Sequence, residues 1–507
     1  MAALSYYSAG KPISFSVVSH ARAMASAARS PQVSNRVAAV PSAMRANAAL
    51  FDNGLESMHE DKTMVVLQKD HAVTVVATET LTVEGATKAE LKVIKDKFGL
   101  QVVREGLFGK VLLRVKDEAG PEAVKKVFES AKSIYLRGKV DAAHPNFVRL
   151  VDHTVRKPSA AIAAIAAAAA AAQPWWNHLN DGTKGVRGAD AAVRAAWTIH
   201  RGDPAIRVAV LDEGVDVNHP DLKASVVAQK DFSENNPTAM PSGNDAHGTA
   251  CSGIIVGRGA TYPGITACSL VAVRIARGDG HGNWIFDDFA TADAIDWAWK
   301  VGEADVLSNS WGGGPPVDAI TNAFERARTK GRNGKGSVIA IAAGNKSTAV
   351  QYPATLPEVL CVGASNEWDE QKTTTSRDGE TWWGSCFGPQ MSLVAPGVHI
   401  ATTDIAGPAG YTPDDYTLTF NGTSSATPHV AAAAALPLRR PETDGKRGAR
   451  HPDRRSREAD RRRPPRPQAE VEQGDGLGPA GHPRGVAAGA ARVRMYVRLS
   501  SLTGESG

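Results

Sequence analysis

The sequence has no run of about 20 apolar residues, so it predicts no membrane-spanning helix. Its most apolar stretch, residues 160–172, is mostly alanine and is soon followed by Pro174. That stretch is too short and too weakly apolar to cross a bilayer, and its composition is typical of a linker. With 507 residues, the chain is long enough for two or three domains with sizeable cores.

Cysteine is also scarce. The chain has four cysteines, none of them in CxxC spacing, which is too few for a disulfide-stapled scaffold. Cys251 and Cys361 lie in apolar runs, which favours buried free thiols. A disulfide between Cys251 and Cys268 stays open at this stage, and with it the redox compartment.

The first 50 residues contain no Asp or Glu but have five Lys or Arg among many Ala and Ser. This composition resembles an organelle transit segment and lacks the apolar centre of a secretory signal. The alternative is a disordered leader without a targeting signal, or a wrongly assigned start codon. On either interpretation we expect residues 1–61 to be disordered.

Most of the chain lacks an excess of charge of either sign. The net charge is +5, but residues 437–507 alone hold 16 Lys and Arg against 9 Asp and Glu, a net of +7. The remainder therefore holds 42 basic and 44 acidic residues, a net of −2. A near-neutral folded part predicts no nucleic-acid partner, and the basic end has no interleaved aromatics to support one.

Residues 62–151 have the pattern of a small α+β domain. Short β-type runs begin at Met64, and residues 87–99 place apolar side chains at helical spacing before a glycine. Two more strands, a helix that starts near Pro121 and a final strand over residues 140–151 follow. The order β-α-β-β-α-β is that of a ferredoxin-like split unit.

An Ala-rich linker is predicted over residues 152–174, and strands alternate with helices beyond it. Compact apolar strands such as residues 207–211 are separated by helical patterns such as residues 286–301. This alternation predicts an α/β domain over residues 175–436, with a doubly wound parallel sheet covered by helices on both faces. Functional groups in such sheets gather at the carboxyl ends of the strands.

Three short segments of this domain hold residues that could do chemistry. VAVLDEGVD places Asp212 directly after a strand, NDAHGTACSG places His247 before a run of small residues, and NGTSSATPHV places Ser424 in a turn before a helix. A serine hydroxyl becomes a nucleophile when an imidazole accepts its proton, and a carboxylate must hold that imidazole in the correct tautomer. Each segment alone is a weak signal, but together they specify one chemistry.

In this order and with these flanks, the three segments resemble the subtilisin-like serine proteases, or subtilases. DVNHPDL after Asp212 and LVAPGV at residues 393–398 extend the resemblance, which runs from about residue 175 to residue 436. The resemblance implies a subtilisin-like fold and a serine endopeptidase that acts on proteins or peptides. Asp212, His247 and Ser424 would form its catalytic triad.

The resemblance also assigns supporting roles. AIAAGN ends at Asn345, where the family has a side-chain donor to the oxyanion. SNSWGGG contains Ser310, Trp311 and Gly312, which would bind an extended substrate through main-chain hydrogen bonds. Trp311 also suggests a bulky wall in the cleft.

Two departures from the family pattern bear on the site. Glu213 stands where Ser or Thr is common, so its carboxyl either raises the pKa of one member of the Asp212–Glu213 pair or points to solvent. VGRGATYPGITAC lacks the Asn-rich loop that binds calcium in many relatives. Asp221 matches a calcium ligand of a relative, but alone we interpret it as a helix-start carboxylate. We therefore expect no cofactor and no strong calcium site, at most weak structural calcium.

The resemblance gives the domain at residues 62–151 a role as well. Secreted subtilases often carry a ferredoxin-like prodomain that assists folding and blocks the cleft, and the final strand here is similar to the last strand of such prodomains. This implies a zymogen that is inhibited by its own prodomain. We expect the protein to be a monomer with no partner other than its substrates. It favours an extracytoplasmic location, against the organelle address that the N-terminus suggests.

The pattern of the catalytic domain ends abruptly at Pro437. The preceding segment, residues 422–436, is predicted to be a helix with its start. Residues 437–507 contain eight prolines and no apolar period, which predicts a disordered tail. The tail is either natural or the product of a frameshift, and we favour the frameshift because the break falls inside a helix. The catalytic domain would then be incomplete, so the alternative to an active protease is an inactive or misfolded relative.

Overall fold

The computed structural model describes residues 4–19, 64–67, 74–152, 175–278 and 283–439. These residues belong to one compact unit that ends at Arg439. Of the predicted linker (residues 152–174) and the predicted tail (residues 437–507), residues 153–174 and 440–507 lie outside the described residues. Within the described part, no helix is long and apolar enough to cross a membrane.

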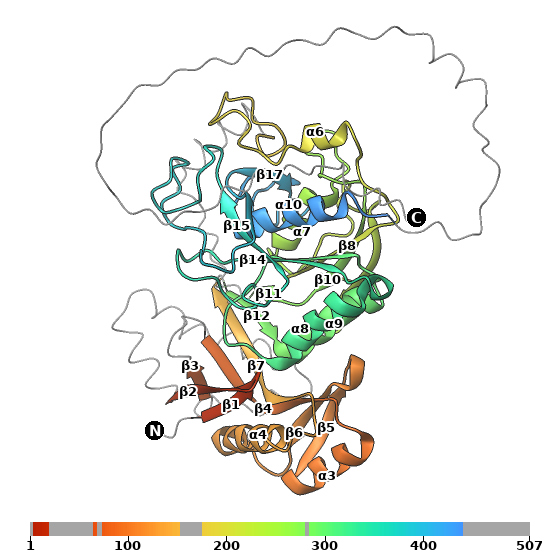
Figure 1. The fold of residues 1–507 in the computed structure, drawn as a ribbon, viewed down its shortest axis with the longest axis vertical. Helices are drawn as coiled ribbons and strands as arrows, with labels where there is room; N and C mark the ends of the chain where they lie inside the picture. The colour runs from red at the N-terminus through yellow and green to blue at the C-terminus, as the bar shows by residue number, and fades with distance from the viewer. Residues whose placement is uncertain (1–3, 20–63, 68–73, 153–174, 279–282, 440–507) are drawn as a thin grey trace, which may run out of the picture. The chain divides into compact units, whose positions relative to one another are not determined.

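A parallel sheet of seven strands forms the centre of the C-terminal domain (Figure 1). Every neighbouring pair of its strands runs parallel, which confirms the fold class predicted from the alternation of strands and helices. In spatial order the strands are β16 (Leu393–Pro396), β15 (Leu360–Ser365), β14 (Val338–Ala342), β13 (Val306–Asn309), β8 (Arg207–Asp212), β10 (Ser269–Arg274) and β9 (Val226–Asp231).

Helices cover both faces of this sheet. Helices α7 (His247–Val256) and α10 (Thr423–Ala435) pack together on one face, and α8 (Asp288–Lys300) and α9 (Asp318–Gly334) pack together on the other. Alternate residues of β8 enter the two layers: Val208 and Val210 join the layer of α7 and α10, while Ala209 and Leu211 join that of α8 and α9. Because both faces are buried, central strands such as β8 and β14 are apolar along most of their length.

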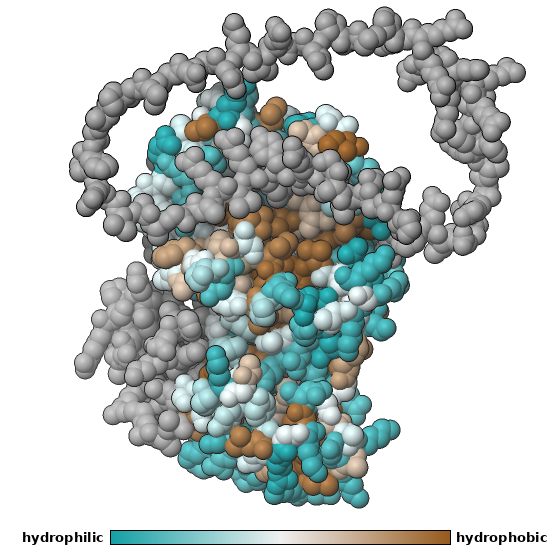
Figure 2. Space-filling model, viewed as in Figure 1, coloured by the Kyte–Doolittle hydropathy of each residue, from teal (hydrophilic) through white to brown (hydrophobic). Residues whose placement is uncertain are grey.

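Smaller elements complete the domain. They are the short helix α6 (Val193–Trp197), the antiparallel pair β17 (Ile400–Thr403) and β18 (Tyr416–Phe420), and the antiparallel pair β11 (Arg277–Gly278) and β12 (Asn283–Asp287). The four cysteines are buried and free, so the disulfide left open between Cys251 and Cys268 is absent. Figure 2 shows hydrophobic residues gathered on the surface in the region where α10, β14 and β8 lie in Figure 1.

The N-terminal domain has the predicted succession of elements. These are β4 (Thr74–Glu84), α3 (Lys88–Phe98), β5 (Leu100–Glu105), β6 (Val111–Val115), α4 (Gly120–Tyr135) and β7 (Ala142–Asp152), with a 3₁₀ turn η1 (Leu107–Gly109) before β6. Strand β4 lies between β6 and β7, β5 pairs with β6, and all these pairings are antiparallel. Local signals define α3: Thr87 and Glu90 form a capping box, and Gly99 ends the helix at φ 63°.

The structure corrects the prediction for the leader. Residues 4–19 are not disordered, because they form β1 (Leu4–Ser8) and β2 (Lys11–Ser19), which continue through β3 (Met64–Leu67) into β4. Leu4, Tyr6 and Ser8 are buried while Ser5 and Tyr7 are half-buried, which is the period-two pattern of a strand. The acid-free composition obscured this alternation in the sequence.

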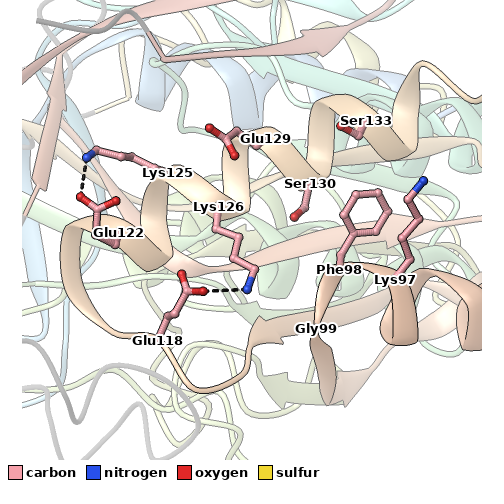
Figure 3. A pocket seen from close by; sticks show the side chains of 10 residues that line it. All are labelled: Lys97, Phe98, Gly99, Glu118, Glu122, Lys125, Lys126, Glu129, Ser130 and Ser133. Atoms are coloured by element: carbon pink, nitrogen blue, oxygen red, sulfur yellow. Dashed lines mark hydrogen bonds and ion pairs between the residues drawn. The ribbon is translucent and has the colours of Figure 1, made fainter.

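A depression of about 480 Å³ lies on the N-terminal domain between the end of α3 and the helix α4 (Figure 3). Ion pairs border it, Lys126 with Glu118 and Lys125 with Glu122. The depression is lined mainly by polar groups and lies on a different domain from Asp212, His247 and Ser424. It is therefore not part of the candidate active site.

Candidate functional site

Asp212 and His247 form a buried pair at the carboxyl edge of the central sheet. Asp212 is the last residue of β8, and His247 is the first residue of α7. Nδ1 of His247 lies 2.9 Å from Oδ1 and 3.0 Å from Oδ2 of Asp212. A carboxylate in this position makes Nδ1 carry the proton, which leaves Nε2 as the base.

Aromatic side chains enclose the imidazole of His247. The ring of Trp284 lies 4.8 Å away at an interplanar angle of 84°, and the ring of Phe420 lies 5.4 Å away at 74°. Only 1% of His247 is exposed. The apolar walls exclude water from the Asp212–His247 hydrogen bond, which strengthens its electrostatic component.

Ser424 lies in the first turn of α10 and is 8% exposed. Its hydroxyl lies 3.4 Å from the main-chain oxygen of Ser310, and its own main-chain oxygen accepts a hydrogen bond of 2.9 Å from the Ser310 hydroxyl. The thiol of Cys251 lies 3.8 Å from Nδ1 of His247 and 3.6 Å from the main-chain oxygen of Ser424. One side chain therefore contacts both predicted residues, and α7 and α10 bring them to the same edge of the sheet.

Asn345 is held beside Ser424 by its carbonyl oxygen. Oδ1 accepts hydrogen bonds of 2.8 Å from both the main-chain nitrogen and the hydroxyl of Thr423. A Cβ added to Gly422 would lie 3.3 Å from Nδ2 of Asn345 and 3.4 Å from the main-chain nitrogen of Ser424. Two N–H groups thus border the space beside Gly422, whose φ of 106° also favours glycine.

The segment Ser310–Gly312 follows β13 directly, as predicted, but the Trp311 side chain does not form a wall of the cleft. It is 5% exposed and lies in the apolar layer between Phe286, at 5.8 Å, and Phe324, at 6.1 Å. A tryptophan next to glycines gives no sequence signal for the face it occupies. Only the main chain of Trp311 remains available to a substrate.

Strand β12 is a part of the site that the sequence interpretation missed. Residues 286 and 287 were assigned to the following helix, but α8 begins at Asp288 and Asp287 is its N-cap. Trp284 of β12 covers His247, and the whole strand pairs antiparallel with β7, with Trp284 opposite Val151. The run NWIFD after the glycine-containing GDGHG is short and apolar enough to have indicated a strand.

Polar contacts join the N-terminal domain to α8 and to the segment after β13. The guanidinium of Arg149 forms a two-point contact with Asp288, at 2.5 and 3.1 Å, and donates to the main-chain oxygens of Gly313 and Pro315. Lys110 pairs with Asp296, and Glu84 pairs with Arg326. These groups are largely buried, so the contacts replace lost hydration.

Glu213 is 3% exposed, so it does not point to solvent. Oε1 accepts a hydrogen bond of 2.8 Å from the main-chain N–H of His247. Burial, then Asp245 and Asp212, raise the pKa of the Glu213 carboxyl well above its usual range. Burial also raises the pKa of Asp245 to about 6. Of the two alternatives for Glu213, the structure therefore supports the raised pKa.

The position predicted to lack calcium contains one carboxylate in close contact with main chain. The hydroxyl of Tyr416 donates to Oδ2 of Asp221 at 2.7 Å, and a Cβ added to Gly259 would lie 2.0 Å from the same oxygen. The loop 257–264 therefore passes directly over Asp221. Oxygen atoms of this kind are the donors that calcium prefers.

A parallel α/β sheet with an Asp–His pair, a helix-start serine and an amide donor at its carboxyl edge defines the class of this protein. The chain belongs to the subtilase family, since residues 203–444 match the family described as Peptidase_S8, subtilase family. Thermitase from Thermoactinomyces vulgaris is 34% identical over 246 residues, which are 48% of this chain and 77% of thermitase. The family assignment made from the motifs is thus confirmed.

Two further relatives are named calcium-dependent proteases. The protein from Nostoc sp. is 28% identical over 440 residues, 78% of this chain and 61% of the relative. The protein from Trichormus variabilis is 30% identical over 352 residues, 62% of this chain and 48% of the relative. The chain thus spans about half to three fifths of the length of these two relatives.

These names contradict the prediction that no strong calcium site exists, and that prediction is wrong. It considered only which side chains the loop 256–268 offers. Calcium is also bound by main-chain carbonyl oxygens, whose arrangement depends on the path of the backbone and not on composition.

Proposed function

We propose that this protein is a serine endopeptidase that hydrolyses peptide bonds through Asp212, His247 and Ser424. The observation that carries the proposal is the buried Asp212–His247 pair at the same sheet edge as Ser424. His247 accepts the Ser424 proton as the hydroxyl attacks the peptide carbonyl, and later returns a proton to the leaving amine. Asp212 stabilises the imidazolium that forms between these two steps.

Asn345 and the Ser424 main-chain N–H bind the negative oxygen of the tetrahedral intermediate. Both nitrogens border the space beside Gly422, and the N-terminus of α10 adds a favourable dipole there. In subtilisin the loss of the asparagine donor lowers turnover about 10²- to 10³-fold, and we expect Asn345→Ala to do the same. KM should change little, because the contact strengthens only in the transition state.

Substrates are extended segments of proteins or peptides. Such a segment forms main-chain hydrogen bonds with Ser310, Trp311 and Gly312, whose backbone leads toward Ser424. On the opposite side it passes the edge formed by β12, where Trp284 covers His247. Main-chain recognition of this kind binds many sequences and fixes only the extended conformation.

A fluorophosphonate probe tests this function directly, because it labels only an activated serine. We expect labelling of the wild-type protein, none of Ser424→Ala, and hydrolysis of casein that parallels the labelling. Asp305→Asn is a suitable control, because Asp305 is a buried carboxylate at the opposite edge of the sheet, bonded to the main-chain nitrogen of Arg207. An unlabelled but folded wild-type protein would instead support the inactive, peptide-binding alternative.

We also propose that the N-terminal domain is a prodomain that inhibits the protease of the same chain, which acts as a monomer. The register of β7 on β12 places Val151 opposite Trp284, and Asp152 opposite Asn283. The chain that follows β7 therefore starts beside the ring that covers His247. From β4 to β7 the domain also has the β-α-β-β-α-β order of a ferredoxin-like unit, which the resemblance to subtilases implies for a prodomain.

Maturation would then consist of cleavage in the linker 153–174 by the enzyme itself. We expect the purified wild-type protein to separate into two fragments on incubation, and Ser424→Ala to stay intact. Added mature enzyme should cleave the Ser424→Ala protein at the same place. Cleavage of Ser424→Ala alone in pure protein would contradict self-processing.

Finally, we propose that calcium stabilises the protein, as the names of two relatives suggest. The Asp221 carboxylate offers oxygen atoms of the kind that a hard cation takes, and Gly259 of the loop 257–264 lies directly against it. When bound, the ion would neutralise Asp221 and hold the loop in place. We expect calcium to raise the melting temperature relative to chelator, and Asp221→Asn to abolish that rise without changing the melting temperature in chelator by much.

A further inference from the structure

Glu213 has a position that the proposed reaction does not use. It follows Asp212 at the end of β8, and its main-chain N–H donates to Oδ1 of Asp212 at 2.8 Å. Its side chain turns to α7 and accepts the main-chain N–H of His247 at 2.8 Å. One residue thus contacts both members of the Asp212–His247 pair, although it touches neither the serine nor the space beside Gly422.

The contact with His247 completes the start of α7. The N-cap residue Ala246 offers no side-chain hydrogen bond, so the first N–H groups of the helix need a partner from elsewhere. Glu213 supplies one from the neighbouring strand. The helix start is also packed tightly on the loop after β8, since a Cβ on Gly248 would lie 2.1 Å from the main-chain oxygen of Gly214. A shift of this turn would therefore move the imidazole with it.

The surroundings of Glu213 are crowded with other acids. Asp212 lies beside it on β8, and Asp245 precedes α7; together with burial, both raise the pKa of the Glu213 carboxyl. Hydrogen bonds from the main-chain N–H of His247 and the indole N–H of Trp284 lower the pKa of the Glu213 carboxyl. Two adjacent buried carboxyls share one proton more readily than both ionise. Burial and both neighbouring acids raise the pKa of Glu213, so we place the shared proton on Glu213.

The remaining charged and titratable groups near Glu213 do not offset this. The guanidinium of Arg274 donates from Nε to the main-chain oxygen of Glu213, but its other nitrogens pair with Asp231 and Glu234. The buried phenol of Tyr411 has no hydrogen-bond partner among the described residues, and burial, followed by the acidic groups near it, raises its pKa. Within the described part of the chain, no cation is therefore dedicated to the Glu213 side chain.

We propose that Glu213 is a positioning residue, and that it acts as a neutral acid. Its carboxyl holds the first turn of α7, which keeps the His247 ring between Asp212 and Ser424. In the neutral form it adds no second negative charge beside the imidazole. This inference rests on the proposed function, because it assigns Glu213 a role in the reaction of that same triad.

The charge state has a measurable consequence. A second carboxylate beside His247 would stabilise the imidazolium form of its ring, because opposite charges attract. The acidic limb of the kcat/KM profile follows the protonation of this base in the free enzyme. A neutral Glu213 leaves that limb where Asp212 alone sets it. Glu213→Gln keeps the shape and an acceptor oxygen but cannot ionise, so it mimics the neutral acid.

The test compares Glu213→Gln, Glu213→Ser and Glu213→Ala on a peptide substrate, with rates normalised to fluorophosphonate-titrated active sites. We expect Glu213→Gln to retain kcat/KM within about threefold with an unmoved acidic limb. The two variants that remove the acceptor should lose about 10- to 100-fold, mainly in kcat, because the base is misplaced. Asp305→Asn controls for the loss of a buried carboxylate elsewhere in the sheet.

Other results overturn the proposal. A kcat per active site that is unchanged in Glu213→Ser or Glu213→Ala would leave Glu213 a purely structural cap. A Glu213→Gln variant as impaired as Glu213→Ala, or one whose acidic limb moves to lower pH, would mean that wild-type Glu213 is ionised.

A second measurement does not depend on activity. The strongly hydrogen-bonded proton between His247 and Asp212 gives a far-downfield NMR signal, which we expect to persist in Glu213→Gln and to shift or broaden in Glu213→Ala. The NMR comparisons of Glu213→Gln and Glu213→Ala with the parent protein are repeated in Ser424→Ala protein. If wild-type protein is unlabelled by the probe, the proposed function fails, yet the signal still decides whether Glu213 positions His247. An identical signal in all variants contradicts the proposal whether or not the enzyme is active.

Discussion

The two boundaries of the catalytic sheet are built from different chemistry. Within the domain, β8 buries apolar side chains toward α7 and α10 on one face and toward α8 and α9 on the other. Where α8 meets the N-terminal domain, buried ion pairs join the apolar contacts: Arg149 pairs with Asp288 and Lys110 with Asp296, while Phe108 stacks on Trp299. The stability of the first boundary depends on apolar burial. The stability of the second also depends on whether its buried charges stay paired.

The difference suggests how one boundary could be undone in the maturation that we propose. An apolar layer is stabilised by about 25 cal/mol for each Å² removed from water, with little dependence on pH. A buried ion pair contributes little net energy while it is intact, but becomes strongly unfavourable once one partner is lost. Removal of a few groups should therefore weaken the N-terminal boundary while leaving the catalytic sheet folded. The predictions below test this contrast, from the largest effect to the smallest.

Ser424→Ala should keep both boundaries intact, because it should prevent cleavage of the linker. Loss of the nucleophile should lower peptide hydrolysis roughly 10⁶-fold, as in subtilisin. The N-terminal domain should then stay covalently attached, which mass spectrometry of the purified protein would show. Wild-type protein purified in parallel is the control, and fragments of equal yield in both samples would refute the prediction.

Arg149→Met should separate the two domains more easily. It leaves Asp288 buried without its guanidinium, which destabilises the contact by about 3–5 kcal/mol. In Ser424→Ala protein, this should appear as faster limited proteolysis of the linker, with the melting temperature of the catalytic domain changed much less.

The double variant Arg149→Met with Asp288→Asn serves as its control. Removal of both charges should recover part of the lost stability, because no unpaired carboxylate remains. If the double variant loses as much stability as the two single variants lose together, the ion pair is not what holds the boundary.

The regularity of a segment decided how well the sequence predicted its structure. Residues 208–211 are apolar throughout, so burial of this strand on both faces could be predicted from the chain alone. Thr87, Glu90 and Gly99 mark the ends of α3 by local hydrogen bonding, which needs no tertiary information. The strand β12 was missed because its last residues, Phe286 and Asp287, also fit the helical pattern of the α8 segment that follows.

In the candidate site, the residue types were predictable but their environments were not. Asp212, His247 and Ser424 could be proposed from the sequence because each lies where a strand ends or a helix begins. The packing of Trp311 depends on which side of the sheet receives it, and the burial of Glu213 depends on the position of α7. The calcium prediction failed for the same kind of reason, since backbone oxygens are arranged by tertiary structure.

Asp287 should make the boundary sensitive to pH. It caps α8 and accepts a hydrogen bond from Asn146, and burial raises the pKa of its carboxyl to about 6. Since the usual value is near 3.8, the folded state binds more protons than the unfolded state between about pH 4 and pH 6. Stability should therefore fall as the pH rises through that window, by at most about 3 kcal/mol, and stay level above it.

Denaturant unfolding of Ser424→Ala protein at pH 4.5, 5.5 and 7 would measure this dependence. Asp287→Asn should flatten the curve in this window while keeping the hydrogen-bond geometry of the cap. The pKa of Asp245 in the catalytic domain is also raised to about 6, so Asp245 should likewise lower stability as the pH rises. Asp245→Asn measures that contribution separately. An unaltered pH dependence in Asp287→Asn would contradict the assignment.

Lys125→Ala should have the smallest effect, although it also removes an ion pair from the N-terminal domain. Lys125 pairs with Glu122 three residues earlier on α4, at the rim of the depression in Figure 3. The two side chains are 45% and 72% exposed, so water and salt already screen their attraction. Exposed pairs of this spacing contribute only about 0.2–0.5 kcal/mol, and alanine is itself a good helix former. Denaturant unfolding of Ser424→Ala protein with and without Lys125→Ala should therefore agree within about 0.5 kcal/mol. A loss comparable with that of Arg149→Met would show that burial is not what separates the two kinds of ion pair.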